Sequence, residues 1–341
     1  MQIAILGATG LVGRTMLGLL ERQPWVDAPP LLLASARSAG AVLPFRGREL
    51  PCREVAVEAL APVRLALFSA GGEASRRWAP VAVERGAWVV DNSSAWRSDP
   101  AVPLVVPEIN GALVPELNAG AAGGIVANPN CSTIQIALPC AALDRAAGLR
   151  EVHATTLQAV SGAGQRGRAE LAAQAAELAK GERADARRAG TVFPRRIAAN
   201  AVPAIGELGE DGYFAEESKV HRELRKILGR QELAVSCTAT RVPVWNGHAA
   251  AVRAVLERPV SLPELREHLA GSPGLVCDGD GGAYTTPAEV SGETVAHVGR
   301  LRHEPGREDV VLFWVVADNL LKGAAWNAVQ IAARLAGSEA R

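Results

Sequence analysis

The chain has 341 residues, more than a single compact core usually holds, so about two domains are expected. Hydrophobic residues make up 48% of it and charged residues 21%, a globular balance that excludes wholesale disorder. The 36 basic residues match 36 acidic ones, which argues against a nucleic-acid-binding protein, and no apolar run reaches the roughly 18 residues that a membrane-spanning helix needs.

The five cysteines bear on redox environment and metal binding. They are odd in number and lack paired spacing, so we expect neither disulfides nor a metal site, and we expect the reducing cytoplasm as the location. The N-terminus leads directly into a candidate strand without a basic leader, so we expect no signal peptide.

Residues 1–130 alternate short apolar runs with segments of helical spacing. A buried strand is expected over 2–6 and a helix over 11–22. Further strand candidates, bounded by Gly, Pro, Asn or Ser, lie at 31–36, 64–70, 87–91, 104–106 and 124–127. Strands alternating with helices predict a parallel sheet covered on both faces.

The pattern changes after Cys131. Period-two alternation over 233–244 and 248–256 is typical of antiparallel strands with one covered face. The other candidates are strands at 152–160, 294–302 and 309–316 and helices at 132–147, 168–180, 216–228 and 320–335. We therefore predict an α/β nucleotide-binding domain over 1–127 and 318–341, to which the last helix returns, and an α+β domain with a large mixed sheet over 128–317.

A glycine-rich turn joins the first strand to the first helix. Glycines at this point permit a tight turn whose backbone N–H groups approach a pyrophosphate at the helix N-terminus. Glycine turns also join strands to helices for purely structural reasons, so the loop alone is a weak signal. The residues of this candidate dinucleotide site are Gly7, Ala8, Thr9, Gly10, Leu11, Val12 and Gly13.

The end of the second strand indicates which dinucleotide binds. An NAD enzyme usually places a carboxylate there for the ribose 2′-hydroxyl, whereas this sequence has Ser35, Arg37 and Ser38. A guanidinium and two hydroxyls suit a 2′-phosphate, so we favour NADP. The alternative is a solvated turn without a ligand.

Cys131 lies at the predicted start of a helix, after a Pro-containing turn. A helix N-terminus stabilises a thiolate, which is the nucleophilic form of cysteine, so Cys131 is a candidate nucleophile. The other four cysteines are interpreted as small buried hydrophobic residues. The local sequence is Asn128-Pro129-Asn130-Cys131-Ser132-Thr133.

Two downstream segments offer partners for a nucleophile. Gln158 ends a predicted strand, where a side chain readily meets a ligand, and Arg241 and His248 flank a tight connection containing Pro and Gly. Histidine is the usual proton carrier near neutral pH. A single histidine in a loop is also compatible with an ordinary surface residue.

Several segments, in order along nearly the whole chain, resemble the aspartate-β-semialdehyde dehydrogenases. NPNCST together with RVPVWNGH is the most specific combination, and the glycine loop is the least specific. The matching segments are GATGLVG at 7–13, DNSSAWR at 91–97, VPEIN at 106–110, NPNCST at 128–133, QAVSGAG at 158–164, EESK at 216–219, RVPVWNGH at 241–248 and VADNLLKGAAWNAVQIA at 316–332.

The resemblance implies a Rossmann-like domain followed by a catalytic and dimerisation domain like that of glyceraldehyde-3-phosphate dehydrogenase, in a homodimer. It implies reduction of aspartyl-4-phosphate by NADPH to aspartate-4-semialdehyde and phosphate, a step that feeds lysine, threonine, methionine and diaminopimelate synthesis. The residues it implies for chemistry are the nucleophile Cys131, the acid/base His248 and the orienting Gln158.

The same resemblance implies substrate and cofactor contacts. Arg241 would hold the substrate carboxylate and Glu216 its amino group, and phosphate would bind to Arg97, Asn130 and Lys219. Further cofactor contacts are implied for Asn92, Ser93, Ser161, Gly162 and Asn319.

Two alternatives remain from sequence. An N-acetyl-γ-glutamyl-phosphate reductase runs the same thioester chemistry on a longer acyl phosphate, although NPNCST and EESK argue against it. A non-catalytic relative that only binds nucleotide would be marked by loss of Cys131 or His248, and both are present.

Overall fold

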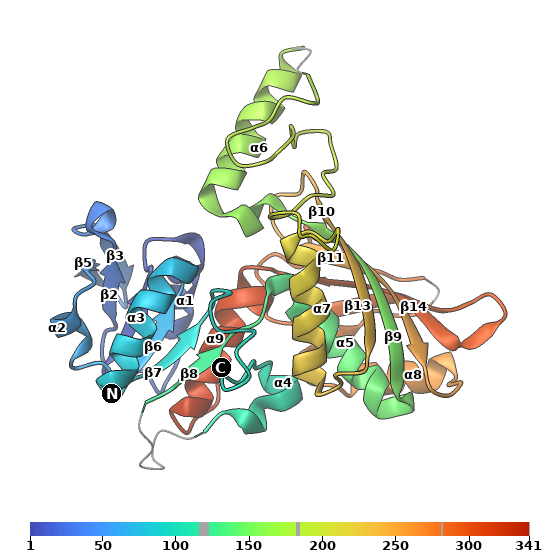
Figure 1. The fold of residues 1–341 in the computed structure, drawn as a ribbon, viewed down its shortest axis with the longest axis horizontal. Coiled ribbons are helices and arrows are strands. Elements are labelled where there is room, and N and C mark those ends of the chain that lie inside the picture. The colour runs from blue at the N-terminus through green and yellow to red at the C-terminus, as the bar shows by residue number, and fades with distance from the viewer. Residues whose placement is uncertain (116–122, 182–184, 281, 341) are drawn as a thin grey trace. The chain divides into compact units, whose positions relative to one another are not determined.

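The computed structural model describes residues 1–115, 123–181, 185–280 and 282–340. The chain divides into two compact units, one formed by Met1–Asn130 with Ala324–Arg341 and the other by Cys131–Gly323 (Figure 1). Within the described residues, no helix is long and apolar enough to cross a membrane.

The first unit is built on a six-stranded parallel sheet in the order β5-β2-β1-β6-β7-β8, which confirms the predicted parallel sheet. Its inner strands are short runs of Leu, Ile, Ala and Phe buried along nearly their whole length, as strands covered on both faces should be. The strands are β1 Ile3–Leu6, β2 Leu31–Ala34, β5 Arg53–Glu54, β6 Leu65–Phe68, β7 Trp88–Asp91 and β8 Ile125–Ala127.

Helices cover both faces of this sheet. Ile3 and Ile5 point into one core cluster with α1 (Leu11–Leu20) and α9 (Trp326–Leu335). Ala4 and Leu6 point into the opposite cluster, which includes residues of α2 (Val57–Leu60) and α3 (Gly72–Glu84). The alternation along β1 thus supplies two cores, and the last helix of the chain belongs to this unit.

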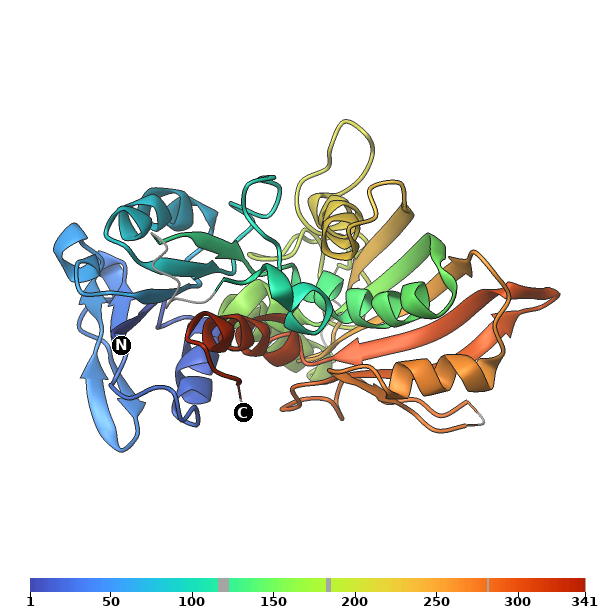
Figure 2. The ribbon, with the colours of Figure 1, turned by 90° about the horizontal axis from the view of Figure 1, so that it is seen from below.

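Sequence periodicity missed or misjudged several short elements here. The hairpin of β3 (Val42–Phe45) and β4 (Arg48–Pro51) projects at the blue end of the chain (Figure 2). The run 104–106, expected as a strand, makes a single bridge from Leu104 to Ala127. Prolines flank this run on both sides, and they lack the N–H that would extend the ladder before α4 (Pro107–Asn110) begins.

The second unit contains the predicted large mixed sheet, in the order β10-β9-β11-β14-β13-β12. β10 runs parallel to β9 and β12 parallel to β13, and the other pairs are antiparallel. Of the two segments predicted as antiparallel strands, 248–256 is confirmed, since β11 pairs antiparallel with β9 and β14, whereas 233–244 is not, because β10 pairs in parallel with β9. The strands are β9 Leu149–Gln158, β10 Ala234–Arg241, β11 His248–Leu256, β12 Leu275–Cys277, β13 Ala296–Glu304 and β14 Arg307–Ala317.

Three helices pack on one face of the mixed sheet, namely α5 (Cys131–Ala147), α7 (Ala215–Leu228) and α8 (Leu262–Ala270). The opposite face leaves side chains of the central strands exposed. α6 (Gly164–Ala179) instead projects away from the sheet (Figure 1).

The closing segment is not one continuous helix as expected over 320–335. A π-helical turn, Leu321–Ala325, precedes α9. π-Helical turns are rare and are found frequently at functional sites.

Candidate active site

The functional side chains of the second unit gather at one edge of its sheet. β9 and β10 end at the partnered residues Gln158 and Arg241, and β11 begins at His248, opposite Ala317 at the end of β14. Gln158, Arg241 and His248 are 1%, 6% and 0% exposed. The sheet therefore brings an amide, a guanidinium and an imidazole to the same edge.

Cys131 is the first residue of α5, where the helix N-terminus favours a thiolate. Gly323 in the π-helical turn packs closely against it, since a Cβ at that position would lie 3.0 Å from the Cys131 Cβ. Burial raises the pKa of the other four thiols, which keeps them protonated and unreactive; these are Cys52, Cys140, Cys237 and Cys277.

The His248 ring is held in one tautomer. The backbone N–H of Ala159 donates to its Nδ1 at 3.0 Å, so the ring proton is on Nε2. Nε2 is buried and has no hydrogen-bond partner among the described residues. Burial, and then the charge of Arg241, lowers the pKa of His248 from 6.5 to about 3. At neutral pH His248 is therefore a neutral imidazole that offers one N–H.

The Arg241 guanidinium binds the same peptide segment, because its Nη1 donates to the Ala159 carbonyl oxygen at 2.7 Å. Burial lowers the pKa of Arg241, and the charges of Glu216 and Cys131 oppose this effect. The group remains a cation, since an arginine keeps its proton at physiological pH. Ala159 thus holds both the imidazole and the guanidinium through its main chain.

Glu216 and Lys219 form an ion pair on α7, with 2.9 Å between the Glu216 Oε2 and the Lys219 Nζ. The Glu216 side chain is 9% exposed and that of Lys219 is 31% exposed. The pair satisfies the ordinary i,i+3 interaction expected on a helix. The charge of Glu216 also opposes the lowering of the Arg241 pKa, so this carboxylate interacts with two cations, Lys219 and Arg241.

Gly162 lies at an exposed point directly beside these groups. A Cβ at this position would lie 2.8 Å from Nη1 of Arg241 and 3.0 Å from Nε2 of His248. Real Cβ atoms rarely approach so closely, so only glycine leaves both groups undisturbed. The Gly162 main chain therefore lies directly against the N–H of His248 and the guanidinium of Arg241.

Ser161 and Asn319 lie in the same unit and bind each other. The Ser161 hydroxyl donates to the Asn319 Oδ1 at 2.9 Å, and the backbone N–H of Gly247 donates to the same oxygen at 3.0 Å. The Asn319 Nδ2 makes no bond to another described residue, so that amide nitrogen is the group it can offer a ligand.

In the first unit, the glycine loop and the end of β2 line one cavity of about 640 Å³. Leu11, Val12 and Gly13 belong instead to the first turn of α1. The sequence did not reveal two carboxylates, a further guanidinium and an indole in the same lining, because they come from distant segments. The predicted lining residues are Gly7, Thr9, Gly10, Ser35, Arg37 and Ser38, and the additional ones include Glu54, Glu58, Arg77 and Trp78.

Two of the glycines are required by the packing of this loop. Gly7 has a φ of +88°, and a Cβ there would collide with the backbone oxygen of Ser69. A Cβ at Gly13 would collide with the backbone oxygen of Gly7. The loop is therefore compressed between the sheet and α1, as a cradle for a pyrophosphate is.

The remaining predicted residues of this unit follow β7 and β8. The Asn92 side-chain amide is buried without a partner among the described residues, which fits a polar ligand group. The Ser93 hydroxyl is engaged, since it donates to the Asp91 Oδ2 at 2.7 Å. Arg97 donates to the carbonyl oxygens of Asn128 and Asn92 at 2.9 and 2.7 Å, and Asn130 is buried directly before Cys131.

Comparisons with known proteins identify the class of this two-domain chain. The family model described as "Semialdehyde dehydrogenase, NAD binding domain" matches residues 2–116, and "Semialdehyde dehydrogenase, dimerisation domain" matches residues 140–322. These matches make the protein an oxidoreductase of the semialdehyde dehydrogenases, with an NAD(P)-binding domain and a dimerisation domain.

Individual relatives define the family more closely. Aspartate-semialdehyde dehydrogenase of Aquifex aeolicus is 42% identical over 97% of this chain and 96% of its own length, and that of Bacillus subtilis is 41% identical over 98% and 97%. A crystal structure of aspartate semialdehyde dehydrogenase II from Vibrio cholerae "complexed with ASA" superposes with a TM-score of 0.90 at 40% identity, covering 97% of this chain and 96% of that one. The chain belongs to the aspartate-semialdehyde dehydrogenase family.

Proposed function

We propose that this enzyme reduces L-aspartyl-4-phosphate with NADPH to L-aspartate-4-semialdehyde and phosphate, through a thioester on Cys131. The observation that carries the proposal is a helix-start cysteine in the same unit as a neutral histidine whose Nε2–H is buried and free. The full-length relatives named above favour this substrate over N-acetyl-γ-glutamyl phosphate. The product would feed lysine, threonine, methionine and diaminopimelate synthesis in the cytoplasm.

Covalent catalysis divides the reaction into two easier steps. The Cys131 thiolate attacks the acyl carbon, and the carbon–oxygen bond to phosphate breaks with its electron pair leaving on the phosphate, which takes a proton from water. NADPH, when bound, supplies the hydride that reduces the thioester carbon. The resulting oxyanion re-forms a carbonyl as the carbon–sulfur bond breaks, which releases the aldehyde and returns the thiolate.

His248, for which the resemblance implies an acid/base role, acts in these steps as a hydrogen-bond donor. Both steps pass through an oxyanion on the former carbonyl oxygen, and collapse of each oxyanion returns the electron pair without any net proton from the ring. A neutral imidazole N–H is therefore sufficient to stabilise it, and the N–H of Ala159 keeps the proton on the required Nε2. The low pKa of His248, about 3, keeps the ring neutral at neutral pH.

The polar groups around the cysteine fit an amino-acid acyl phosphate. The planar fork of Arg241 suits the α-carboxylate, and Glu216 suits the α-amino group of a free amino acid. Arg97, Asn130 and Lys219 would bind the phosphate, and Gln158 would orient the acyl group. An N-acetylated substrate would leave the buried Glu216 facing a neutral amide.

The cofactor would be NADP. The cavity around the glycine loop offers Arg37 with Ser35 and Ser38 for a 2′-phosphate. Both the hydroxyl and the backbone N–H of Ser93 donate to Asp91, so the Ser93 carbonyl oxygen is the group left for a cofactor contact. The other proposed cofactor contacts are Gly7, Thr9, Gly10, Leu11, Val12, Gly13, Asn92, Ser161, Gly162 and Asn319.

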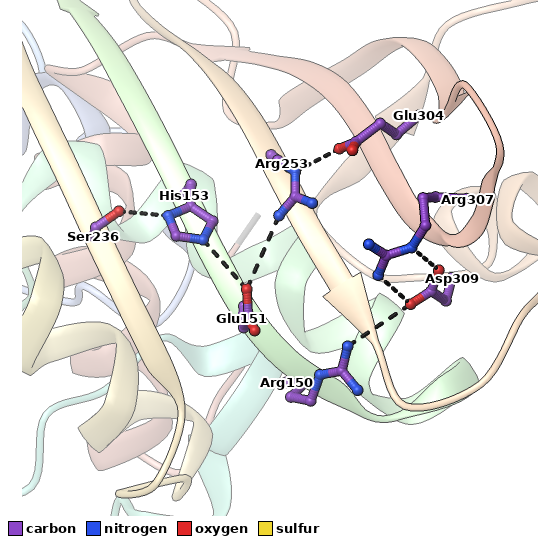
Figure 3. A network of polar contacts seen from close by, with 8 residues as sticks. All are labelled: Arg150, Glu151, His153, Ser236, Arg253, Glu304, Arg307 and Asp309. Atoms are coloured by element: carbon purple, nitrogen blue, oxygen red, sulfur yellow. Dashed lines mark hydrogen bonds and ion pairs between the residues drawn. The ribbon is translucent and has the colours of Figure 1, made fainter.

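The protein would be a homodimer that pairs through the helix-free face of the mixed sheet. This face carries complementary charges, with His153 between Ser236 and Glu151, and Arg253 2.6 Å from Glu304 (Figure 3). A hollow of about 480 Å³ lies on the same face, lined by side chains of β9, β10 and β11. Opposite charges and a hollow on one surface suit an isologous contact, in which each copy presents the same patch.

A phosphate-release assay with the two acyl phosphates tests the proposal. The enzyme with NADPH should release phosphate from aspartyl-4-phosphate and oxidise one NADPH for each phosphate released. Comparable turnover of N-acetyl-γ-glutamyl phosphate would favour the alternative reductase. Binding of NADPH without turnover of either substrate would identify a non-catalytic relative.

A further inference from the structure

Asp318 follows β14 and is only 3% exposed, yet its carboxylate has no cationic partner among the described residues. It accepts hydrogen bonds from amide groups instead. The backbone N–H groups of Leu320 and Leu321 donate to Oδ1 at 2.8 and 3.1 Å. The Asn246 side chain and the backbone N–H of Gly292 donate to Oδ2 at 2.8 and 2.9 Å. A buried carboxylate whose two oxygens both accept hydrogen bonds is held in place, and it connects the segments that donate to it.

The two oxygens of Asp318 serve opposite sides of the site. Oδ1 fixes the start of the turn that contains Gly323, whose own N–H donates to the Asp318 backbone oxygen at 3.0 Å. Gly323 is the residue packed against Cys131. Oδ2 fixes Asn246, two residues before His248. One side chain thus joins the segment behind the nucleophile to the loop that carries the histidine.

The next residue extends the same junction. Asn319 binds the Gly247 N–H and the Ser161 hydroxyl through one oxygen, so it joins the histidine loop to the turn that contains Gly162. A shift of Asp318 would move Asn319 with it, because the two residues are consecutive. The hydrogen bonds of the Asp318 carboxylate reach neither Cys131 nor His248 directly.

We propose that Asp318 is a positioning residue for the reductive dephosphorylation: its carboxylate sets the separation between Cys131 and the Nε2–H of His248. The inference rests on the proposed function, because it concerns how that thioester chemistry is aligned. Placement errors of about 1 Å at reacting groups cost on the order of a hundredfold in rate, so a small shift at this junction is measurable.

Asp318→Asn replaces one acceptor oxygen with an NH₂ group, which then faces the donors of Asn246 or of the backbone. We expect kcat to fall between about ten- and a hundredfold. Asn246→Ala removes one of the bonds from a half-buried residue and should lower kcat in the same direction by less. The double variant Asn246→Asp/Asp318→Asn restores an acceptor and a donor and should recover part of the rate.

Glu170→Gln is the matched control. The Glu170 carboxylate also accepts from backbone and hydroxyl groups, those of Thr191 and Val192, but in the α6 region away from the catalytic loops. It should lower the unfolding midpoint and leave kcat unchanged. A lowered midpoint with unchanged kcat in Asp318→Asn would overturn the proposal, as would a loss of rate in the control equal to that in Asp318→Asn. If Asp318→Asn does not fold, Asn246→Ala decides by the same criterion.

A second readout separates this inference from the proposed function. ¹⁵N NMR of the His248 ring, assigned with His248→Gln, should give a single Nε2–H tautomer in the wild type and a shifted or mixed signal in Asp318→Asn. An unchanged His248 signal in that variant would overturn the inference, whatever the substrate proves to be. A wild type inactive on both acyl phosphates, with the NMR difference present, would overturn only the proposed function.

Discussion

Gly162→Ala tests the close approach of His248 and Arg241 to the main chain of Gly162. The added Cβ would lie 2.8 Å from Nη1 of Arg241 and 3.0 Å from Nε2 of His248, against 3.4–4 Å for ordinary contact. Both groups must therefore retreat by about half an ångström, and both are bound to the Ala159 main chain, which limits their movement. Overpacking of this kind costs about 1–3 kcal/mol of stability.

The larger effect should be on rate. Because a misplacement of about 1 Å costs on the order of a hundredfold, we expect kcat to fall at least about tenfold. The assay follows NADPH absorbance with aspartate semialdehyde, phosphate and NADP, and a fluorescence titration measures the Kd for NADP. The control is Gly279→Ala, where an added Cβ has no neighbour within 4 Å. A kcat within about twofold of the control would refute the idea that catalysis needs His248 and Arg241 in these positions, and a purely weaker Kd would assign Gly162 to the cofactor.

Three further substitutions test other parts of the site. Arg37→Ala should weaken NADPH by about 1.5–3 kcal/mol, seen as a higher KM, and leave NADH almost unchanged; equal weakening of both would make Arg37 a residue of the fold. Arg241→Lys should cost roughly 2–4 kcal/mol in kcat/KM, because lysine cannot both bind the Ala159 oxygen and grip a carboxylate with two parallel bonds; near-normal kinetics would contradict this role. For His248, the folded pKa is about 3 against 6.5 normally, so unfolded chains take up the proton first and stability is lost as the pH falls from 6.5 towards 3. The free energy of unfolding should therefore drop more steeply over that range in the wild type than in His248→Gln, and parallel curves from chemical denaturation would argue against a buried neutral ring.

The sequence was informative wherever a side chain or a period carries the signal. Buried runs such as 64–70 predicted a parallel sheet because strands covered on both faces are apolar throughout. Period two along 233–244 indicates which residues face the core, but it contains no information on which strand lies alongside or in which direction, so the parallel pairing of β10 with β9 was not predicted. The hairpin of β3 and β4 was not predicted, because Pro44 and Pro51 lie within its strands and a proline argues against a strand.

The groups of the site likewise divide into those that the sequence predicts and those that only the structure reveals. Gln158, Arg241 and His248 were predictable as residues, and the sheet register explains why they meet. The backbone of Ala159, which binds two of them, has no side-chain signature. In the sequence, Asp318 is an ordinary acidic residue after a predicted strand. Its four amide donors are apparent only in the folded chain.

The nucleotide cavity gives a further example. The absence of a carboxylate at the end of β2 suggested NADP, yet Glu54 of β5 is paired alongside Ala34 at that point. Strand neighbours that are distant in sequence can thus change the charge around a motif. Arg37 would therefore have to bind a 2′-phosphate in a cavity that also contains the negative charge of Glu54.

The central claim, a thioester on Cys131, can be tested by running the reaction backwards without phosphate. Mixing the enzyme with aspartate semialdehyde and NADP should give a burst of one NADPH for each active chain, and intact-mass and peptide mass spectrometry should find one aspartyl group on Cys131. Cys131→Ala should give neither the burst nor the adduct while still binding NADP. An aspartyl group on another residue, or a full burst from Cys131→Ala, would contradict the assignment of the nucleophile.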